Sequence, residues 1–273
     1  AMTAILTAAP VTPSTPHAPV ESWTVNLASG LRLQVPPSLR CLTTYVLLEQ
    51  ETWFEPEMSL LPLVLEPGMH ALDIGANHGI YALEIARCTG SGHVWAFEPT
   101  SEPLQRLRAS VTANGLGDRI TVVGAGLADA DGEASFALQD NSELNSRGGT
   151  GSRRETVRLL ALDGYLAAHA PGQVIDFVKL DAEGEEVNVL AGGQRFFAQQ
   201  SPVVMFEFKH GASQNTPLLA AWQALGYDLF RWSAELRLLL PFDSATSELD
   251  FALTLLAIRP ARQQHLAQRG LLV

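Results

Sequence analysis

The sequence predicts an α/β fold in which a mostly parallel sheet carries helices on both faces, with a small extension in front of it. The chain has 273 residues, 47% of them apolar, and can therefore bury a large core. From residue 69 onward, short apolar runs alternate with segments of helical periodicity. Strands that are apolar on both faces and separated by helices are typical of parallel sheets, which bind ligands beyond the carboxyl ends of their strands.

The chain divides into a tail, an extension, a main domain and a second tail. Residues 1–20 are rich in Pro and Thr, and we expect them to be poorly ordered. Residues 21–65 are expected to form a hairpin, "SWTVNLASGLRLQVP", and a helix, "LRCLTTYVLLEQETW", that ends near Trp53. Residues 66–262 hold the main domain, and residues 263–273 are expected to be a C-terminal tail.

The main domain is predicted from its apolar runs and from two well-marked helices. "NHGIYALEIARC" has its apolar residues on adjoining helical faces. "TSEPLQRLRASVTANG" begins with a capping residue, Thr100 or Ser101, has Pro103 in its first turn and ends at Gly115. The runs that we expect to form strands are "MHALDI", "HVWAFE", "ITVVGA", "VIDFVKL", "PVVMFEF", "YDLFRW" and "DFALTLLAI".

The segment 132–160 interrupts this alternation. "GEASFALQ" and "ETVRLLAL" predict a hairpin, and the connecting residues 139–154 are rich in Gly and Ser. Long loops of this kind inside compact domains are often lids over a site or disordered segments. The sequence leaves both alternatives open for this flexible loop.

The charge balance disfavours one class of partner. A formal charge of −11 is unfavourable for tracking phosphates, so we expect no binding to nucleic acid. Apolar runs stay far below the ~20 residues of a membrane helix, so we expect no membrane contact. The two cysteines, Cys41 and Cys88, form no CxxC pair, which is typical of a reducing compartment. We therefore expect a cytoplasmic protein that acts on a small molecule, and a homo-oligomer remains open.

The turn "LDIGANHG" is a candidate ligand-binding turn after the first strand. Gly75 and Gly79 let a backbone approach a ligand closely. Asn77 stands at the second glycine of the dinucleotide-binding pattern, and Asp73 would repel a pyrophosphate but attract an ammonium group. This favours S-adenosylmethionine over NAD. An ordinary tight turn is the alternative, and His78 is expected to be a variable position.

Glu98 ends the second strand, where an acidic side chain can accept hydrogen bonds from both hydroxyls of a ribose. The same carboxylate would oppose a 2′-phosphate, so NADP is disfavoured. A simple acidic strand end is the alternative reading of Glu98 taken alone.

Several motifs, in order, resemble the FkbM-type S-adenosylmethionine-dependent methyltransferases, from about residue 40 to residue 260. They are "LTTYVLLEQETWFEPE", "MHALDIGANHGIYALEIA", "HVWAFEPTSEPLQRLRASVTANGL", "GLADADGEASF" and "IDFVKLDAEGEEVNVLAGG". The resemblance implies a Rossmann-like class I methyltransferase, with a seven-stranded sheet whose last strand is antiparallel. It also implies O-methylation of a hydroxyl on a sugar or secondary metabolite.

The resemblance further implies a set of cofactor-binding residues. The turn would hold the methionine part of the donor, Glu98 would hold its ribose, and the adenine would lie near the end of the third strand. By this reading the cofactor-binding residues are Asp73, Gly75, Ala76, Asn77, Gly79, Glu98, Pro99, Ala125 and Gly126. An NAD-dependent oxidoreductase and a non-catalytic cofactor-binding module are the alternatives for the whole protein.

The stretch "VKLDAEGEE" places four carboxylates behind the fourth strand. Asp181, at the strand end, is the first candidate for aligning or deprotonating an acceptor hydroxyl. Gly184 is expected to permit a turn, and Glu185 and Glu186 to lie in the first turn of a helix. Glu183 can cap that helix or point into the pocket, and capping is the favoured reading. An ending in "LDAEG", without the Asn/Asp-Pro-Pro-aromatic sequence of many amino-directed enzymes, disfavours N-methylation.

The fifth strand adds Glu207 and His210. A buried carboxylate needs a partner, and Lys179 on the adjacent strand is expected to pair with Glu207 in a structural role. His210 is a second candidate base because its ordinary pKa lies near neutrality. Asp181, Glu183 and Glu207 could bind a divalent ion. Metal-independent transfer is nevertheless favoured, because Glu207 lies within its strand and no Asp-Asn or Asp-Asp pair follows it.

Overall fold

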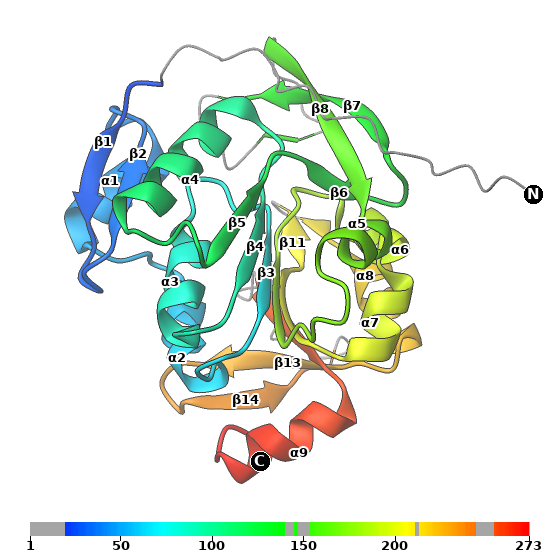
Figure 1. Cartoon of the computed structure of the whole chain (residues 1–273). Coiled ribbons are helices and arrows are strands. Elements are labelled where there is room, and N and C mark those ends of the chain that lie inside the picture. Colours follow the sequence, from blue (N-terminus) through cyan, green and yellow to red (C-terminus); the bar gives the residue numbers. More distant parts are fainter. Residues whose placement is uncertain (1–19, 140–144, 147–152, 211–212, 244–253, 273) are drawn as a thin grey trace, which may run out of the picture.

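The computed structural model describes residues 20–139, 145–146, 153–210, 213–243 and 254–272. Its main sheet consists of β3 (Ala71–Ile74), β4 (Val94–Phe97), β5 (Ile120–Val123), β9 (Phe177–Leu180), β10 (Val203–Glu207), β13 (Asp228–Ser233), β14 (Leu238–Pro241) and β15 (Thr254–Ile258). In space the order is β14-β13-β15-β10-β9-β3-β4-β5 (Figure 1). The strands predicted from the seven apolar runs are all present.

The pairing of the strands agrees with the expected topology, apart from one addition. β3 pairs in parallel with β4 and β9, and β9 with β10. β15, the last strand in the chain, is antiparallel to both of its neighbours, as expected. The expected count of seven strands is wrong, because β14 adds an eighth at the edge. It returns from β13 through the turn 234–237, in which Arg237 has a left-handed φ of 54°.

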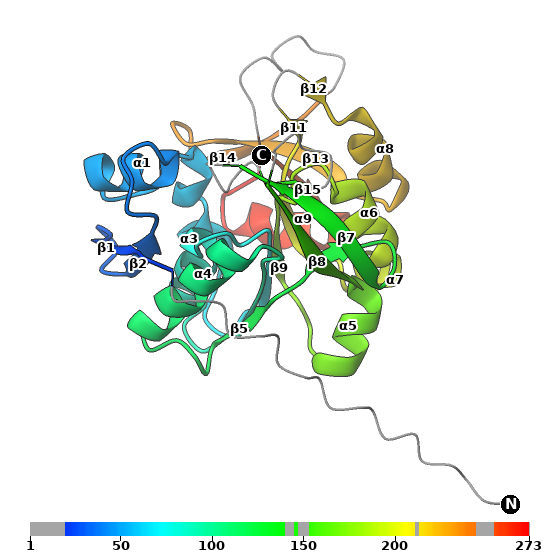
Figure 2. The same cartoon turned by 90° about the horizontal axis from the view of Figure 1, so that it is seen from above.

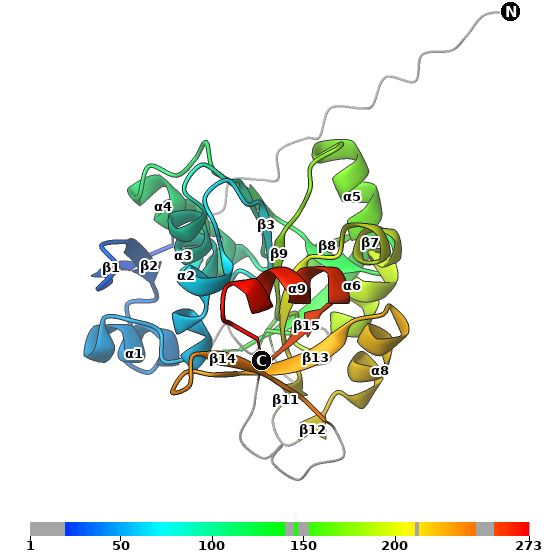
Figure 3. The ribbon, with the colours of Figure 1, turned by 90° about the horizontal axis from the view of Figure 1, so that it is seen from below.

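Helices cover both faces of the sheet, as the views from above and below show (Figures 2 and 3). Along each strand, alternate side chains enter opposite cores: Val203 and Met205 of β10 join one apolar cluster, and Val204 and Phe206 the other. The first core is shared with α2 (Leu61–Val64), α3 (Ile80–Thr89), α4 (Ser101–Ala113) and α9 (Pro260–Gln268). The second is shared with α5 (Leu162–His169), α6 (Glu186–Gly192), α7 (Gln194–Gln200) and α8 (Thr216–Ala224).

The extension forms the expected hairpin of β1 (Trp23–Asn26) and β2 (Arg32–Val35), followed by α1 (Leu42–Gln50) and the 3-10 turn η1 (Pro56–Ser59). α1 ends at Gln50, before the expected Trp53, because Glu51 takes a left-handed φ of 56°. The backbone N–H of Gln34 donates to Ser110 Oγ of α4 at 2.9 Å, and Trp232 Nε1 donates to Ser59 Oγ at 3.0 Å. The extension is thus fixed to the main domain at two separate places.

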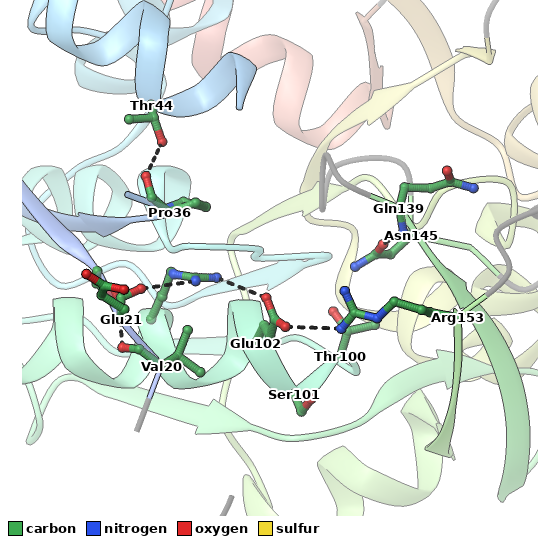
Figure 4. A network of polar contacts seen from close by, with 12 residues as sticks. Val20, Glu21, Pro36, Thr44, Thr100, Ser101, Glu102, Gln139, Asn145 and Arg153 are labelled. Atoms are coloured by element: carbon green, nitrogen blue, oxygen red, sulfur yellow. Dashed lines mark hydrogen bonds and ion pairs between the residues drawn. The ribbon is translucent and has the colours of Figure 1, made fainter. Parts of the chain in front are cut away.

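A second sheet lies beside the first. β7 (Gly132–Leu138) and β8 (Arg153–Ala161) form the expected antiparallel hairpin, and β6 (Gly126–Ala128) pairs in parallel with β8. Arg153 of β8 reaches Glu102 of α4 at 3.3 Å (Figure 4). Most of the loop 139–154 lies outside the described residues, so the predicted alternatives of a lid or a disordered segment fall outside them as well. Within it, Asn145 accepts from the N–H of Gln139 at 2.7 Å.

The C-terminal residues differ from the expected tail. α9 extends to Gln268, and Leu266 and Leu271 are buried. Arg262 Nη2 lies 2.7 Å from Asp176 Oδ1, and the N–H of Leu239 in β14 donates to the carbonyl of Leu271 at 2.8 Å. This segment therefore packs against the first core of the main sheet and contacts the edge strand β14. In the described part of the chain, no helix has the length and apolar character needed to cross a bilayer.

Candidate active site

A cavity of about 480 Å³ lies where β3, β4, β9 and β10 end. Its volume is within the usual range of small-molecule sites, which is roughly 300–1,000 Å³. The turn after β3, the segments after β4 and β9, and the end of β10 line it. Residues on and after α1 in the extension line it as well, including Trp53 and Phe54.

Backbone hydrogen bonds and close packing hold the turn after β3 in place. The N–H groups of Gly75 and Ala76 both donate to the carbonyl of Phe97, and Gly75 has φ of 82°. A Cβ on Gly75 would lie 1.7 Å from the carbonyl oxygen of Asp181, and one on Gly79 would lie 2.6 Å from Leu107 Cδ1. The sequence suggested these glycines as places of close approach to a ligand. The structure shows that backbone packing already requires Gly75, and that the positive φ of Gly79, 98°, already favours glycine at that position.

Asp73 is buried in β3, directly between Ala96 of β4 and Lys179 of β9. Its Oδ2 has no hydrogen-bond partner in the structure. Burial raises the pKa of Asp73 to about 7, an effect that Lys179 opposes and Asp181 reinforces. An orphaned carboxylate oxygen in a cavity wall is complementary to a cationic group, as the ammonium of a methionine moiety would be.

Glu98 follows β4 and is also buried, with its carboxylate held from both sides. Its Oε2 accepts from the N–H of Asn77 at 3.0 Å, and its Oε1 accepts from the N–H and the hydroxyl of Thr100. Burial raises the pKa of Glu98, although these hydrogen bonds oppose the shift. These hydrogen bonds orient the carboxylate, at the position expected for ribose binding, before any ligand arrives. Each carboxylate oxygen can accept more than one hydrogen bond.

The part of the cavity that was expected to hold the adenine agrees only partly with the prediction. Pro99 and Gly126 line the cavity together with Leu127 and Phe136. Ala125, by contrast, is buried in the apolar core and is absent from the described part of the cavity wall. Leu127 and Phe136 come from the second sheet, and the sequence did not identify either as a cavity residue.

Asp181 and Lys179 form an ion pair at the end of β9. Lys179 Nζ lies 2.9 Å from Asp181 Oδ2 and 4.8 Å from the centroid of the Tyr81 ring. Burial alone would lower the pKa of Lys179, but Asp181, Glu55 and Asp73 raise it above its ordinary value. Asp181 Oδ1 is buried without a hydrogen-bond partner. The acid that the sequence chose as the candidate base therefore has one oxygen fixed by an ammonium group.

The expected pairing of Lys179 with Glu207 is wrong. The parallel register sets Lys179 opposite Met205, which leaves Asp181, two residues further along the same face of the strand, as the nearer carboxylate. Glu207 also lines the cavity. Burial raises the pKa of Glu207 to about 9, with smaller contributions in the same direction from Asp181 and Glu183. Its carboxyl group is therefore protonated at neutral pH and can donate a hydrogen bond.

The turn after Asp181 determines where the other three acidic residues of this stretch lie. Glu183 and Gly184 have positive φ values of 51° and 96°, so the chain turns there, as predicted for Gly184. Glu185 is the N-cap residue of α6 and Glu186 its first residue. Glu186 is buried and accepts from the N–H groups of Ala182 and Gly184 at 2.9 and 3.1 Å. The favoured reading of Glu183 as a cap is wrong, because Glu183 lines the cavity instead.

One triplet of carboxylates could supply ligands to a metal ion. Single oxygens of Asp181, Glu186 and Glu207 lie within 4.8 Å of one another. The third carboxylate is Glu186, whereas the prediction from the sequence was Glu183. Two of the three are already engaged, Asp181 by Lys179 and Glu186 by two backbone N–H groups. The donor set therefore already has competing partners.

The two histidines that the sequence considered have different outcomes. The backbone of His210 pairs with Ser213 in the short ladder of β11 (Lys209–His210) and β12 (Ser213–Gln214), but its side chain lies outside the described residues. His78 lines the cavity and is buried, although the sequence suggested a variable position. Burial, followed by the nearby Arg106, lowers the pKa of His78 to about 3, so its ring is neutral.

Residues that the sequence did not identify complete the cavity. Tyr81 of α3 is buried and donates a hydrogen bond to Glu55 Oε2 of the extension. Thr43 of α1 lines the cavity with Leu42. The only signal for Tyr81 was its place on the first crossover helix, and the contacts of Glu55 and Thr43 depend on how the extension folds back.

The strand order, with an antiparallel strand inserted next to β13, defines a class I methyltransferase fold. The family model described as "Methyltransferase FkbM domain" matches residues 73–229, which is more than half of the chain. The chain belongs to the FkbM methyltransferase family, as its motifs suggested. Membership implies S-adenosylmethionine as the methyl donor, and the orphaned oxygen of Asp73 and the preoriented Glu98 fit such a group.

Other similarities are more distant. A segment of 117 residues is 35% identical to the AMB antimetabolite synthetase AmbE of Pseudomonas aeruginosa, and it covers 42% of this chain but only 5% of that protein. The structure of the methyltransferase FkbM from Methylobacillus flagellatus KT has 19% identity and a TM-score of 0.47, with 79% of this chain and 53% of that chain covered. An O-methyltransferase from Thermotoga maritima has 14% identity and a TM-score of 0.42, with 88% and 78% covered.

Proposed function

We propose that the protein is an S-adenosylmethionine-dependent O-methyltransferase that acts on a hydroxyl of a small molecule. The observation that carries the proposal is the Lys179–Asp181 pair, which holds a carboxylate at the cavity wall next to the Asp73 turn. An alcohol is a weak nucleophile, and a carboxylate within reach of its proton is the group that it needs.

The cavity residues divide the work of binding the donor. Asp73 would hold its ammonium group, Glu98 its ribose hydroxyls, and the walls formed by Leu127 and Phe136 its adenine. The bound donor supplies an electrophilic methyl group on its sulfonium, so alignment of the nucleophile provides much of the acceleration.

The acceptor hydroxyl would be served by the groups after β9 and β10. Asp181 aligns the hydroxyl and accepts its proton, while Lys179 keeps the carboxylate from turning away. Glu207, protonated at neutral pH, can donate a hydrogen bond to an acceptor oxygen, and Glu183 lines the same wall. His210 remains a second candidate base.

Sugars and secondary metabolites are the acceptors that we propose, in a cytoplasmic setting. The acidic chain, at −11, argues against a nucleic-acid acceptor. The similarity to AmbE, an antimetabolite synthetase, agrees with a role in small-molecule metabolism. We also propose that transfer needs no metal, since Lys179 and two N–H groups compete for the acidic triplet.

The test is transfer of an isotopically labelled methyl group from the donor to a metabolite library, followed by mass spectrometry. The expected product carries the label on an oxygen and forms equally well with and without EDTA. A label on nitrogen would refute O-methylation, and loss of product in EDTA would refute the metal-independent reaction. A labelled donor that binds without any transfer would favour a non-catalytic module.

A further inference from the structure

Two neighbouring threonines of α1 are both buried but differ in their hydrogen bonds. Thr44 Oγ1 donates to the carbonyl of Pro36 at 2.8 Å (Figure 4). Thr43 is only 1% exposed, and its Oγ1 has no hydrogen-bond partner in the structure. Thr43 lines the cavity, whereas Thr44 is absent from the described part of the cavity wall. The chain thus provides an unsatisfied hydroxyl at the site and a satisfied one beside it.

An unsatisfied hydroxyl at this place calls for an explanation. Burying a polar group without a partner costs about 1–3 kcal/mol, and most buried polar groups in proteins avoid this cost. Thr43 shares its helix with the buried apolar residues Val46 and Leu47, so a Val at position 43 would fold at least as well. A ligand group that accepts a hydrogen bond removes the penalty only when the ligand is bound.

The charges around the cavity indicate which ligand group this is. The donor has a cationic ammonium group, ribose hydroxyls and an anionic α-carboxylate. Asp73 suits the ammonium group and Glu98 suits the hydroxyls, but both repel a carboxylate. In the described cavity wall, Lys179 is the one cationic lysine or arginine side chain, and it is engaged by Asp181. The carboxylate therefore needs a neutral donor.

We infer that Thr43 donates a hydrogen bond to the α-carboxylate of the bound methyl donor. This inference rests on the proposed function, and it makes the N-terminal extension a part of the donor site. All donor-binding residues predicted from the sequence lie in the main domain. Thr43 lies outside the matched residues 73–229.

The test uses calorimetric binding of S-adenosylhomocysteine and of methylthioadenosine, which lacks the amino-acid part. For Thr43→Val, the Kd of S-adenosylhomocysteine should rise about tenfold, as expected when a hydrogen bond to a charged group is lost. The Kd of methylthioadenosine should stay within about twofold. Thr43→Ser keeps the hydroxyl and should retain the wild-type affinity.

Thr44→Val is the matched control. It should lower the melting temperature of the ligand-free protein, because it removes the hydrogen bond to Pro36, and leave both Kd values unchanged. Thr43→Val should not lower that melting temperature. An unchanged Kd of S-adenosylhomocysteine in Thr43→Val, or equal weakening of both ligands, overturns the inference. If the wild-type protein binds neither ligand, the proposed function fails, and the inference fails with it.

Discussion

The ion pair between Lys179 and Asp181 is the residue-level feature on which the proposed chemistry depends. A buried ammonium group beside a carboxylate limits the rotation of that carboxylate and gives it one orientation toward the cavity. Tyr81 supports Lys179 through its ring, and Glu55 accepts from the Tyr81 hydroxyl. The orientation of the candidate base is therefore set by side chains from β9, α3 and the extension together.

Asp181→Asn tests the role of this carboxylate. The amide keeps an oxygen acceptor for Lys179 but is not a base, so kcat/KM for a labelled acceptor should fall by about 10²–10⁴. The Kd of S-adenosylhomocysteine, measured by calorimetry, should change by less than about threefold. A variant with nearly wild-type turnover would show that positioning without a base is sufficient.

Glu207 gives a prediction about pH. Its pKa is about 9 in the folded protein, against 4.5 ordinarily, so the folded state holds a proton that the unfolded state has released between these values. Stability contributed by this group is present below pH 4.5 and is lost as the pH rises toward 9. In Glu207→Gln this loss is absent, so the melting temperature of the variant should rise relative to that of the wild type as the pH increases from 5 to 9. A constant difference across that range would contradict the assignment.

Some site residues could be predicted from the sequence because their positions follow from strand ends. Asp73, Glu98 and Asp181 each stand where a parallel strand finishes, so a linear pattern is enough to bring them to one edge. The partner of Lys179 depends on register and side-chain reach, and the contact between Tyr81 and Glu55 depends on the path of the extension. Neither is encoded in local periodicity.

At the level of elements, the turn between β3 and α3 is the most constrained segment. Gly75 combines a positive φ with a space that the carbonyl of Asp181 fills. Backbone atoms cannot move aside as the end of a flexible side chain can.

Gly75→Ala should therefore lower the free energy of unfolding by more than about 3 kcal/mol, which combines strain with overpacking. Gly115→Ala is the control, since Gly115 has φ of 64° but no atom within 4 Å of an added Cβ, and about 1–2 kcal/mol of strain is expected there. Urea denaturation measures both. Equal losses in the two variants would show that the contact with Asp181 relaxes easily.

The predicted strands were correct because buried parallel strands are short, continuous apolar runs. β14 and α9 were not identified, for different reasons. β14, with the sequence "LLLP", follows a turn in which Arg237 has a positive φ. Arginine is not a residue type that indicates a turn, so the sequence did not show where β13 ends and β14 begins. α9 has Pro260 at its start, yet its surface is mostly polar, so its residues resemble a tail.

At the level of the whole molecule, a ligand that binds only the folded protein should stabilise all of it. S-adenosylhomocysteine at 100 times its Kd adds about 2.7 kcal/mol, which corresponds to a rise in melting temperature of roughly 5–10 °C for a domain of this size. NAD at the same concentration should have no effect, because Asp73 opposes a pyrophosphate. A rise with NAD alone would point to the oxidoreductase alternative.

The contact between Gly75 and Asp181 also has a consequence for how two ligands affect each other. The turn proposed to receive the donor and the strand end proposed to receive the acceptor touch through backbone atoms, without a compressible side chain between them. A shift of one by a few tenths of an ångström has to displace the other. We therefore expect the proposed donor and acceptor sites to be thermodynamically linked, so that any factor by which the donor changes the affinity for the acceptor equals the factor by which the acceptor changes the affinity for the donor.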